Sequence, residues 1–321
     1  MMALRACVLS MAVLALAGEA AARDFPSKSI RFIVPWPPGG GADFLSRVVA
    51  QKLTGQYGHN VVVDNRGGAG GVIGTELAAK APADGYTWLL ETAPTTIAPA
   101  LHARIGFDVV KDFIPVSLIA SAPYVFASHP SLPVKSVAEL IAYAKGQPGQ
   151  LSYSSSGNGS VPHLAGALLK TRAGVQITHV PYRGTGPAIA DTLAGHVQLT
   201  ISNLVPMRAQ INAGKLRGLA VTSLQRVKLL PDLPTIAESG FPGFEASVWY
   251  GVAVPAGTPT TLVIAINSDV NQALRAPDVA PRLSQEGATP LSVTPRQFAA
   301  YVDSELKKWA EAVRVSGAKA D

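Results

Sequence analysis

The sequence predicts an α/β protein with two lobes, each a mostly parallel sheet flanked by helices. Short apolar segments alternate with amphipathic helical patterns along most of the chain, which is typical of parallel sheets with helices on their faces. The expected strands outnumber the five or six of an ordinary sheet. A chain of 321 residues, 48% of them hydrophobic, can bury one large core or two medium ones.

The first part of the chain predicts strands at residues 30–34, 61–63 and 86–90. The first of these, IRFIV, is apolar except for Arg31 and stops at Pro35. A helix is expected over 42–53, because its apolar residues recur on one helical face. A second helix is expected over 72–80.

The same alternation continues to the end of the chain. Strands are expected at residues 124–127, 151–153, 178–180, 197–201, 216–221 and 249–254. Helices are expected at residues 137–145, 162–171, 187–193, 259–274 and 295–315. No long linker separates the elements of one lobe from those of the other, so segments 119–124 and 247–252 are predicted to cross directly between the lobes. The predicted domains are residues 23–122 with 249–321 for lobe 1, and 123–248 for lobe 2.

The N-terminus has the pattern of a secretory signal. Arg5 precedes an apolar stretch at residues 6–17, and the small residues 20–22 predict cleavage near Ala22, which leaves residues 1–22 as signal peptide. The stretch is too short for a permanent membrane anchor. Cys7 is the only cysteine, so the expected mature chain has no disulfide, thiolate chemistry or Cys-based metal site.

Several function classes lack their sequence signatures. The net charge of +6 comes with no run of Lys or Arg, which favours a mild attraction for anions over nucleic-acid binding. There is no Gly-x-Ser-x-Gly elbow, no Walker motif and no metal-ligand spacing among the six histidines. We therefore predict no catalytic residue, no metal and no cofactor.

One enzyme hypothesis has partial support. The strand at 61–63 is followed by Gly68, Gly70 and Gly74, and Glu91 ends the next strand, as in a dinucleotide-binding fingerprint. The glycine spacing is G-x-G-x-x-x-G rather than G-x-G-x-x-G. Glycines that allow a tight turn and close helix packing explain the segment better.

Three segments join a strand end, small residues and a helix start. We call them the glycine loop (residues 37–43), the serine loop (154–163) and the tyrosine loop (180–188, with Asp191 one turn into its helix). Bare glycine backbone and the unpaired N–H groups of a first helical turn together form an anion site. In the glycine loop, Asp43 is expected to accept from backbone N–H groups or a water and fix the loop.

Ligands of open parallel sheets bind at the carboxyl ends of the strands, so the three loops predict an anion held between the lobes. An alternative remains for each loop. The glycine and serine loops are also compatible with plain turns, His163 with a structural hydrogen-bonding residue, and Tyr182 with a cap on the core of its lobe.

Motifs along almost the whole mature chain resemble one known family, the solute-binding proteins of tripartite tricarboxylate transporters, often called Bug or TctC-like proteins. In chain order they are FPSKSIR (25–31), VPWPPGGGAD (34–43), NRGGAGG (65–71), ADGYT (83–87), KDFIPV (111–116), HVPYRG (179–184), GKLRGLAVT (214–222) and WYG (249–251).

This resemblance implies a two-lobed, type II-like (Venus-flytrap) periplasmic binding protein. It would be a monomer that closes around a small carboxylated solute, such as an amino acid, a dicarboxylate or an aromatic acid, and delivers it to a membrane permease. In this family, backbone amides and ordered waters recognise much of the carboxylate. The ligand residues that the resemblance carries over are Gly39, Gly40, Gly41 and Asp43; Ser155, Ser156, Gly157 and His163; and Tyr182, Gly184, Pro187, Ala188 and Asp191.

Two positions depart from the family pattern. Glu91 stands beside Thr92 and Ala93 where small residues are usual; facing the cleft, it would repel a second carboxylate and favour an amine or amide. Trp36 stands where phenylalanine is commoner and offers a larger surface for stacking on a ring. Two other classes stay open: a secreted cleft enzyme, either hydrolytic or dinucleotide-dependent, and a ligand sensor for a membrane-bound kinase.

Overall fold

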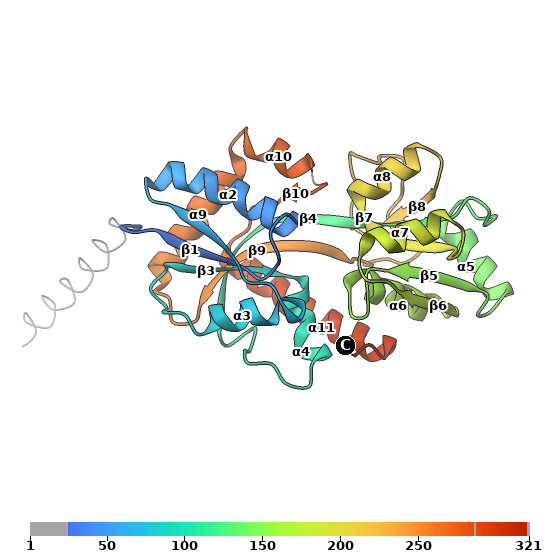
Figure 1. Cartoon of the computed structure of the whole chain (residues 1–321), viewed down its shortest axis with the longest axis horizontal. Coiled ribbons are helices and arrows are strands. Elements are labelled where there is room, and N and C mark those ends of the chain that lie inside the picture. The colour runs from blue at the N-terminus through green and yellow to red at the C-terminus, as the bar shows by residue number, and fades with distance from the viewer. Residues whose placement is uncertain (1–24, 286, 320–321) are drawn as a thin grey trace, which may run out of the picture.

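A mixed β-sheet runs through two lobes of the computed structural model, which describes residues 25–285 and 287–319 (Figure 1). Its strand order is β2-β1-β3-β9-β4-β7-β5-β6, with β8 and β10 also pairing with β4. The α/β fold with two lobes is thus confirmed. The predicted signal peptide, with Arg5, Cys7 and the cleavage point near Ala22, lies outside the described residues.

The first lobe is built on three parallel strands, in which Phe32 of β1 lies between Val63 of β2 and Trp88 of β3. Its strands are β1 (Ile30–Val34), β2 (Val61–Asn65) and β3 (Thr87–Thr92). Its helices are α2 (Gly41–Tyr57), the short η1 (Ala69–Gly71), α3 (Val72–Ala79), α4 (Ala93–Leu101), α9 (Thr260–Arg275) and α10 (Val279–Gln285). Helices α2 and α9 cover one face of the sheet, and α3 and α4 lie across the other (Figure 1).

The second lobe repeats this plan. Strand β5 pairs in parallel with both β6 and β7. The strands of this lobe are β5 (Leu151–Ser155), β6 (Ile177–Pro181), β7 (Leu199–Asn203) and β8 (Arg217–Val221). The helices are α5 (Val137–Gly146), α6 (Val161–Ala173), α7 (Thr185–Leu193) and α8 (Leu204–Asn212).

Two long strands connect the lobes, β4 (Phe113–Ser128) and β9 (Ser247–Pro255). They contain the two predicted crossing segments and pair antiparallel, with Ser121 opposite Trp249. The sheet is mixed rather than mostly parallel, because these strands, and β10 (Thr289–Pro290), run antiparallel to their neighbours. The sheet continues through both crossing strands, so the exact domain boundaries at residues 122 and 249 stay a prediction.

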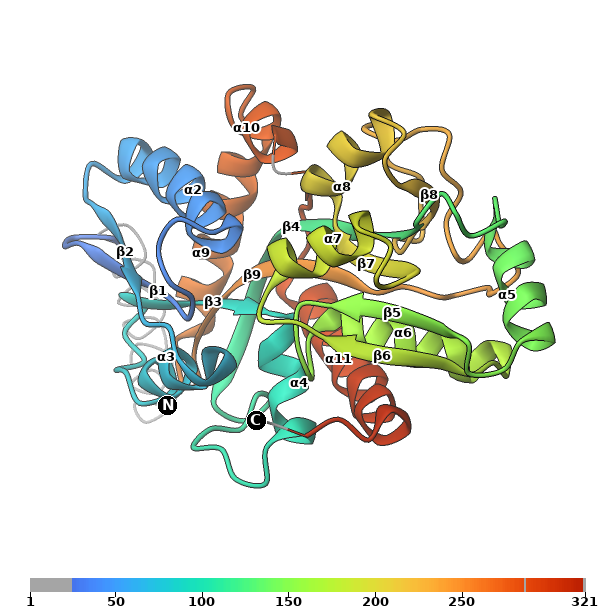
Figure 2. The same ribbon diagram turned by 45° about the vertical axis from the view of Figure 1, so that its right-hand side comes forward.

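The C-terminal helix α11 (Pro295–Ser316) contacts both halves of the molecule. It packs on α4 of the first lobe, on α6 of the second and on the crossing strand β4 (Figure 2). The sequence assigns this helix to lobe 1. In the structure it lies beneath the junction and braces it.

A buried carboxylate fixes α11 to the second crossing strand. One oxygen of Glu305, Oε2, accepts from Trp249 Nε1 at 2.7 Å and from Trp309 Nε1 at 2.8 Å. Its other oxygen contacts the ammonium of Lys308, which also pairs with Glu245 at 2.8 Å. Glu305 is only 1% exposed, so its charge depends on these partners.

Three α-helices of the described residues, α4, α8 and α10, are absent from the sequence prediction. Helix α4 contains Pro94 and Pro99, and α8 contains Pro206, residues that normally argue against a helix. Pro94 lies in the first turn of α4, where proline is tolerated because its missing N–H would have no partner. Within the described ranges, we find no helix with the length and apolarity that a membrane span requires.

We predict that Glu305→Ala destabilises the protein by about 3 kcal/mol. The substitution leaves two buried indole N–H groups and the Lys308 ammonium without their acceptor. Urea unfolding followed by tryptophan fluorescence measures the change. Glu311→Ala, which removes an exposed ion pair with Arg314, is the matched control and is expected to cost less than about 1 kcal/mol. Equal effects of the two substitutions would contradict the prediction.

Candidate functional site

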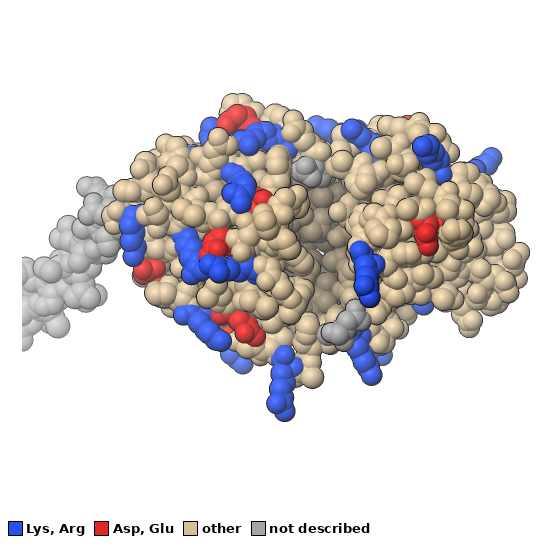
Figure 3. All heavy atoms as spheres, in the orientation of Figure 1, with Lys and Arg blue, Asp and Glu red and all other residues tan. Residues whose placement is uncertain are grey.

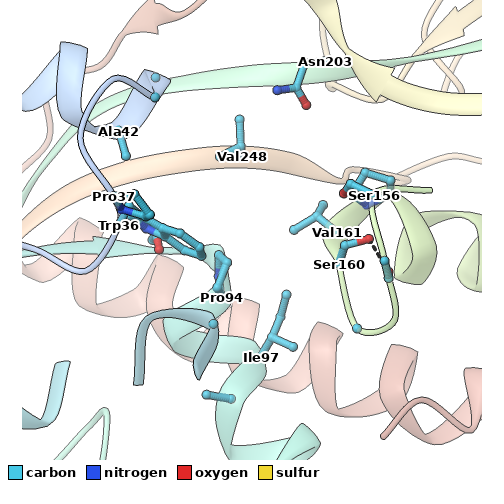
Figure 4. A pocket seen from close by; sticks show the side chains of 18 of the residues that line it. Trp36, Pro37, Ala42, Pro94, Ile97, Ser156, Ser160, Val161, Asn203 and Val248 are labelled. Atoms are coloured by element: carbon cyan, nitrogen blue, oxygen red, sulfur yellow. Dashed lines mark hydrogen bonds between the residues drawn. The ribbon is translucent and has the colours of Figure 1, made fainter. Parts of the chain in front are cut away.

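A cleft of about 930 Å³ lies between the two lobes. Figure 3 shows it as a hollow with uncharged residues on its visible walls, and Figure 4 shows side chains reaching into it from both sides. The lining residues are Trp36, Pro37, Pro38, Gly39, Gly40, Gly41, Ala42, Ala69, Gly70, Thr92, Pro94, Ile97, Ala98, Leu101, His102, Tyr124, Ser156, Gly157, Asn158, Gly159, Ser160, Val161, Pro162, Asn203, Val248 and Tyr250.

Within the described chain, no Asp, Glu, Lys or Arg lines this cleft. Four helices instead begin at it: the N-cap or first-turn residues of α2, α4, α6 and α8 are all among the lining residues. The first N–H groups of a helix have no intrahelical partner and carry the positive end of its dipole. The described part of the cleft wall therefore has the character of an anion site built without Lys or Arg.

The glycine loop lies at the start of α2, as predicted. Asp43 does not line the cleft; it lies behind the loop, where its Oδ2 accepts from Gly39 N at 2.9 Å. Arg47 Nε lies 2.9 Å from the other carboxylate oxygen. Burial alone would raise the pKa of Asp43, but hydrogen bonds from Arg47, Gly39 and Asn65, together with the charge of Arg47, outweigh it and hold that pKa below its usual value. The hydrogen bond expected between the Asp43 carboxylate and a backbone N–H is present, and its role in fixing the loop stays a prediction.

The serine loop faces the glycine loop from the second lobe. Ser156 and Gly157 line the cleft, whereas Ser155 lies buried behind them and its Oγ accepts from Gly157 N at 3.2 Å. His163 is also buried behind the loop, where its Nδ1 accepts from Gly159 N at 3.1 Å. For His163 the structural alternative is therefore the one that the geometry supports.

The tyrosine loop is not part of the cleft wall. None of Tyr182, Gly184, Pro187, Ala188 and Asp191 lines the cleft. The loop follows β6, which is the outer strand of its half of the sheet. The Tyr182 hydroxyl donates to Asp191 Oδ2 at 2.7 Å, so the two residues pair with each other. The place predicted for this loop is taken by Asn203, the N-cap of α8, which follows the inner strand β7.

From the sequence, Trp36 and three residues at the end of β3 (Glu91, Thr92 and Ala93) are also expected at the cleft, and only some of these four lie there. Trp36 and Thr92 line it, but Ala93 and Glu91 do not. Side chains alternate along a strand, so Glu91 lies on the same face as Leu89, opposite to Thr92. Glu91 is fully buried, both its carboxylate oxygens lack a hydrogen-bond partner among the described residues, and burial raises its pKa to about 8. Its expected repulsion of a second carboxylate in the cleft is not supported.

The apolar wall of the cleft is a feature that sequence reasoning missed. Pro94, Ile97, Ala98 and Leu101 come from one side of α4, and Val248 comes from β9. In Figure 4, Trp36 and Pro94 lie side by side, while Ser156, Ser160 and Val161 lie opposite. The i, i+3, i+4 spacing from Pro94 to Leu101 was a helical signal that the two prolines of this segment concealed.

The glycine-rich segment after β2 has a packing role. A Cβ added at Gly74 would lie 2.5 Å from Arg66 O and 2.8 Å from Pro35 Cα, so only glycine fits. Glu91, the candidate ribose-binding acid of the dinucleotide hypothesis, is buried away from the cleft. The arrangement therefore favours close helix packing over dinucleotide binding.

The chain matches known proteins along most of its length. A family model described as the tripartite tricarboxylate transporter family receptor matches residues 45–317. Protein BugT of Bordetella pertussis is 40% identical over 311 residues, which cover 96% of this chain and 95% of that protein.

Solved structures agree with this match. A protein of R. palustris solved with adipate has a TM-score of 0.76 and is 39% identical, with 92% of this chain and 99% of that chain covered. MatC of Rhodopseudomonas palustris, solved with bound malate, has a TM-score of 0.71 and is 30% identical, with coverage of 90% and 100%.

The burial of Glu91 predicts an unusual pH dependence of stability. Its pKa is about 8 in the folded chain and near 4.5 in the unfolded chain, so the folded state retains a proton that the unfolded state has released. Stability is therefore lost as pH rises from about 4.5 to 8. We expect Glu91→Gln to gain stability relative to the wild type over this range, by up to about 1.4 kcal/mol per pH unit.

Urea unfolding at pH 5, 6, 7 and 8 tests this expectation. Glu311→Gln, at an exposed position, serves as the control and is expected to follow the wild-type curve. Parallel curves for Glu91→Gln and wild type would show that Glu91 does not titrate differently in the folded protein.

Proposed function

This chain belongs to the tripartite tricarboxylate transporter receptor family, whose members are solute-binding receptors rather than enzymes, and we propose that it captures a small carboxylated solute in its inter-lobe cleft. One observation carries the proposal: helix N-termini from both lobes begin at a cleft that no charged side chain of the described residues lines. Backbone amides would hold the carboxylate, and no covalent step is involved.

Neutral donors suit a receptor that must also release its solute. A carboxylate held by a buried arginine gains strong, charge-assisted hydrogen bonds. A helix N-terminus contributes a smaller attraction, about 0.3–2 kcal/mol for each dipole. Affinity would then require donors from both lobes at once, so that the solute favours the closed state through its contacts with each of them.

The walls of the cleft indicate which solutes fit. The apolar side of α4 together with Trp36 would cover the body of a solute, while its carboxylate lies at the glycine or serine loop. Adipate and malate, found with two similar proteins, are small dicarboxylates. For this chain we propose a dicarboxylate, an amino acid or an aromatic acid.

The proposal extends to place and partner. The receptor would act as a monomer in the periplasm after removal of residues 1–22, and would deliver its solute to the membrane permease of a tripartite tricarboxylate-type transporter. The family and the leader-like N-terminus support this assignment.

A thermal-shift screen tests the receptor function. Dicarboxylates including adipate and malate, amino acids and aromatic acids are each added to the purified protein. We expect at least one of them to raise the Tm, because a ligand at 100 times its Kd stabilises the folded state by about 2.7 kcal/mol. No shift with any carboxylate would contradict the proposal. Chemical conversion of a bound carboxylate, detected by mass spectrometry, would favour an enzyme, and capture of a membrane-bound kinase would favour a sensor.

We predict that Asp43→Ala weakens binding of the solute identified in that screen by roughly tenfold, because the Gly39 N–H loses its buried acceptor and the glycine loop loses its shape. Isothermal titration calorimetry measures the affinity, and circular dichroism checks that the variant is folded. Asp278→Ala, which removes an exposed partner of Lys52, is the control and is expected to bind as the wild type does. Unchanged affinity in Asp43→Ala would remove the glycine loop from the site.

A further inference from the structure

Two stacked imidazoles lie directly behind the serine loop. The rings of His163 and His179 are 3.7 Å apart and inclined by only 4°. His163 Nδ1 accepts from Gly159 N at 3.1 Å, and His179 Nε2 lies 2.7 Å from Ser155 Oγ. One ring therefore contacts Gly159, in the middle of the segment 156–162 that lines the cleft, and the other contacts Ser155, just before that segment.

The hydrogen bond from Gly159 defines the protonation of His163. An N–H can donate only to an unprotonated ring nitrogen, so Nδ1 carries no proton and the neutral ring carries it on Nε2. A protonated ring would present an N–H to the N–H of Gly159, two donors facing each other. The loop in its present shape thus requires a neutral His163.

From this contact we propose that His163, supported by His179, is a positioning residue that fixes the serine loop in the shape presented to the solute, and that protonation of His163 releases this shape. The inference rests on the proposed function, because the serine loop matters only if the cleft binds a solute. His163 itself does not line the cleft, so it would act through Gly159 and its neighbours.

The surroundings of the pair keep it neutral. Burial and, to a smaller extent, the charge of the nearby Lys170 together lower the pKa of His163 to about 4. Burial, His163 and Lys170 lower the pKa of His179 to about 3. The ring of Tyr153 lies 5.0 Å from that of His179.

A pocket of about 320 Å³ borders both rings on the side away from the cleft. Its charged residues are Lys170 from α6 and Lys319 after α11, and no Asp or Glu is among its described lining residues. Among the residues that the structure describes, no carboxylate there would stabilise an imidazolium. Asn158 lines this pocket as well as the cleft, so the serine loop is the partition between the two.

The sign of the pH effect follows from these values. Above about pH 5 both rings are neutral, Gly159 donates to His163, and the loop is held. As pH falls through about 4, His163 gains a proton and the hydrogen bond is lost. Affinity for the solute is expected to fall there for a reason separate from protonation of the solute itself.

Nuclear magnetic resonance of the solute-free protein tests the positioning step directly. The amide signal of Gly159 and the ring signals of His163 are followed from pH 7 to pH 3. We expect them to titrate together with a midpoint near 4, and the Gly159 transition to disappear in His163→Asn, whose side-chain oxygen replaces Nδ1 as an acceptor without titrating. A Gly159 signal that does not follow His163 would overturn the inference.

Calorimetry with adipate and malate as probes tests the consequence for binding. At pH 7, His163→Leu, which has no acceptor, is expected to bind a probe roughly tenfold more weakly than wild type, while His163→Asn stays within about threefold. Between pH 6 and 4 the ratio of the wild-type Kd to the His163→Asn Kd is expected to rise. Protonation of the probe changes both Kd values by the same factor, so its effect cancels in this ratio.

His59→Asn, at an exposed histidine, is the matched control and should follow the wild type at every pH. Equal binding by His163→Leu and wild type, or a constant ratio, would overturn the inference while leaving the receptor function intact. If neither the wild type nor any variant binds a carboxylate, the proposed function fails, and the Gly159 titration still decides whether His163 positions the loop.

Discussion

Backbone amides can hold an anion only where the loops that carry them are already fixed, and this constraint organises both walls of the cleft. A charged side chain can swing to meet a ligand, but a peptide N–H points where its loop places it. In each lobe a buried side chain therefore accepts from a glycine N–H: Asp43 from Gly39, and His163 from Gly159. The polar groups that shape the site lie behind the surface that would contact the solute.

The connection between the lobes meets a different requirement. Closure needs two rigid halves joined by segments that can bend together, and β4 and β9 pair along their crossing, with Ser121 opposite Trp249. Helix α11 packs against both lobes beneath that crossing, and Glu305 joins it to Trp249. The junction is thus a packed three-part unit rather than a flexible linker, which favours a defined motion about the crossing strands.

Sequence patterns predicted most of this fold because each signal was local. The strand at residues 30–34 is found with those bounds, and the glycine and serine loops begin α2 and α6 as expected. The errors concern information that a local pattern does not carry. Hydrophobic periodicity does not show that β6 is an outer strand, a position that places Tyr182 away from the cleft. It also does not show on which face of β3 the Glu91 side chain lies. Helix α4 was missed because Pro94 and Pro99 hide its spacing.

The absence of charge from the cleft wall, within the described chain, also bears on selectivity. Helix dipoles attract any small anion, so they distinguish poorly between one carboxylate and another. Discrimination must then come from the shape of the cleft and from its apolar wall, where Trp36 and Ile97 would exclude water from the body of the solute. Burial of apolar area contributes about 25 cal/mol per Å², so a solute that leaves this wall uncovered loses affinity even when its carboxylate is fully bound. On this view the helix N-termini of both lobes attract the carboxylate, and the apolar side chains of α4 together with Trp36 discriminate between solutes. Residues that determine which solute is preferred are therefore expected among the apolar side chains rather than among charged ones.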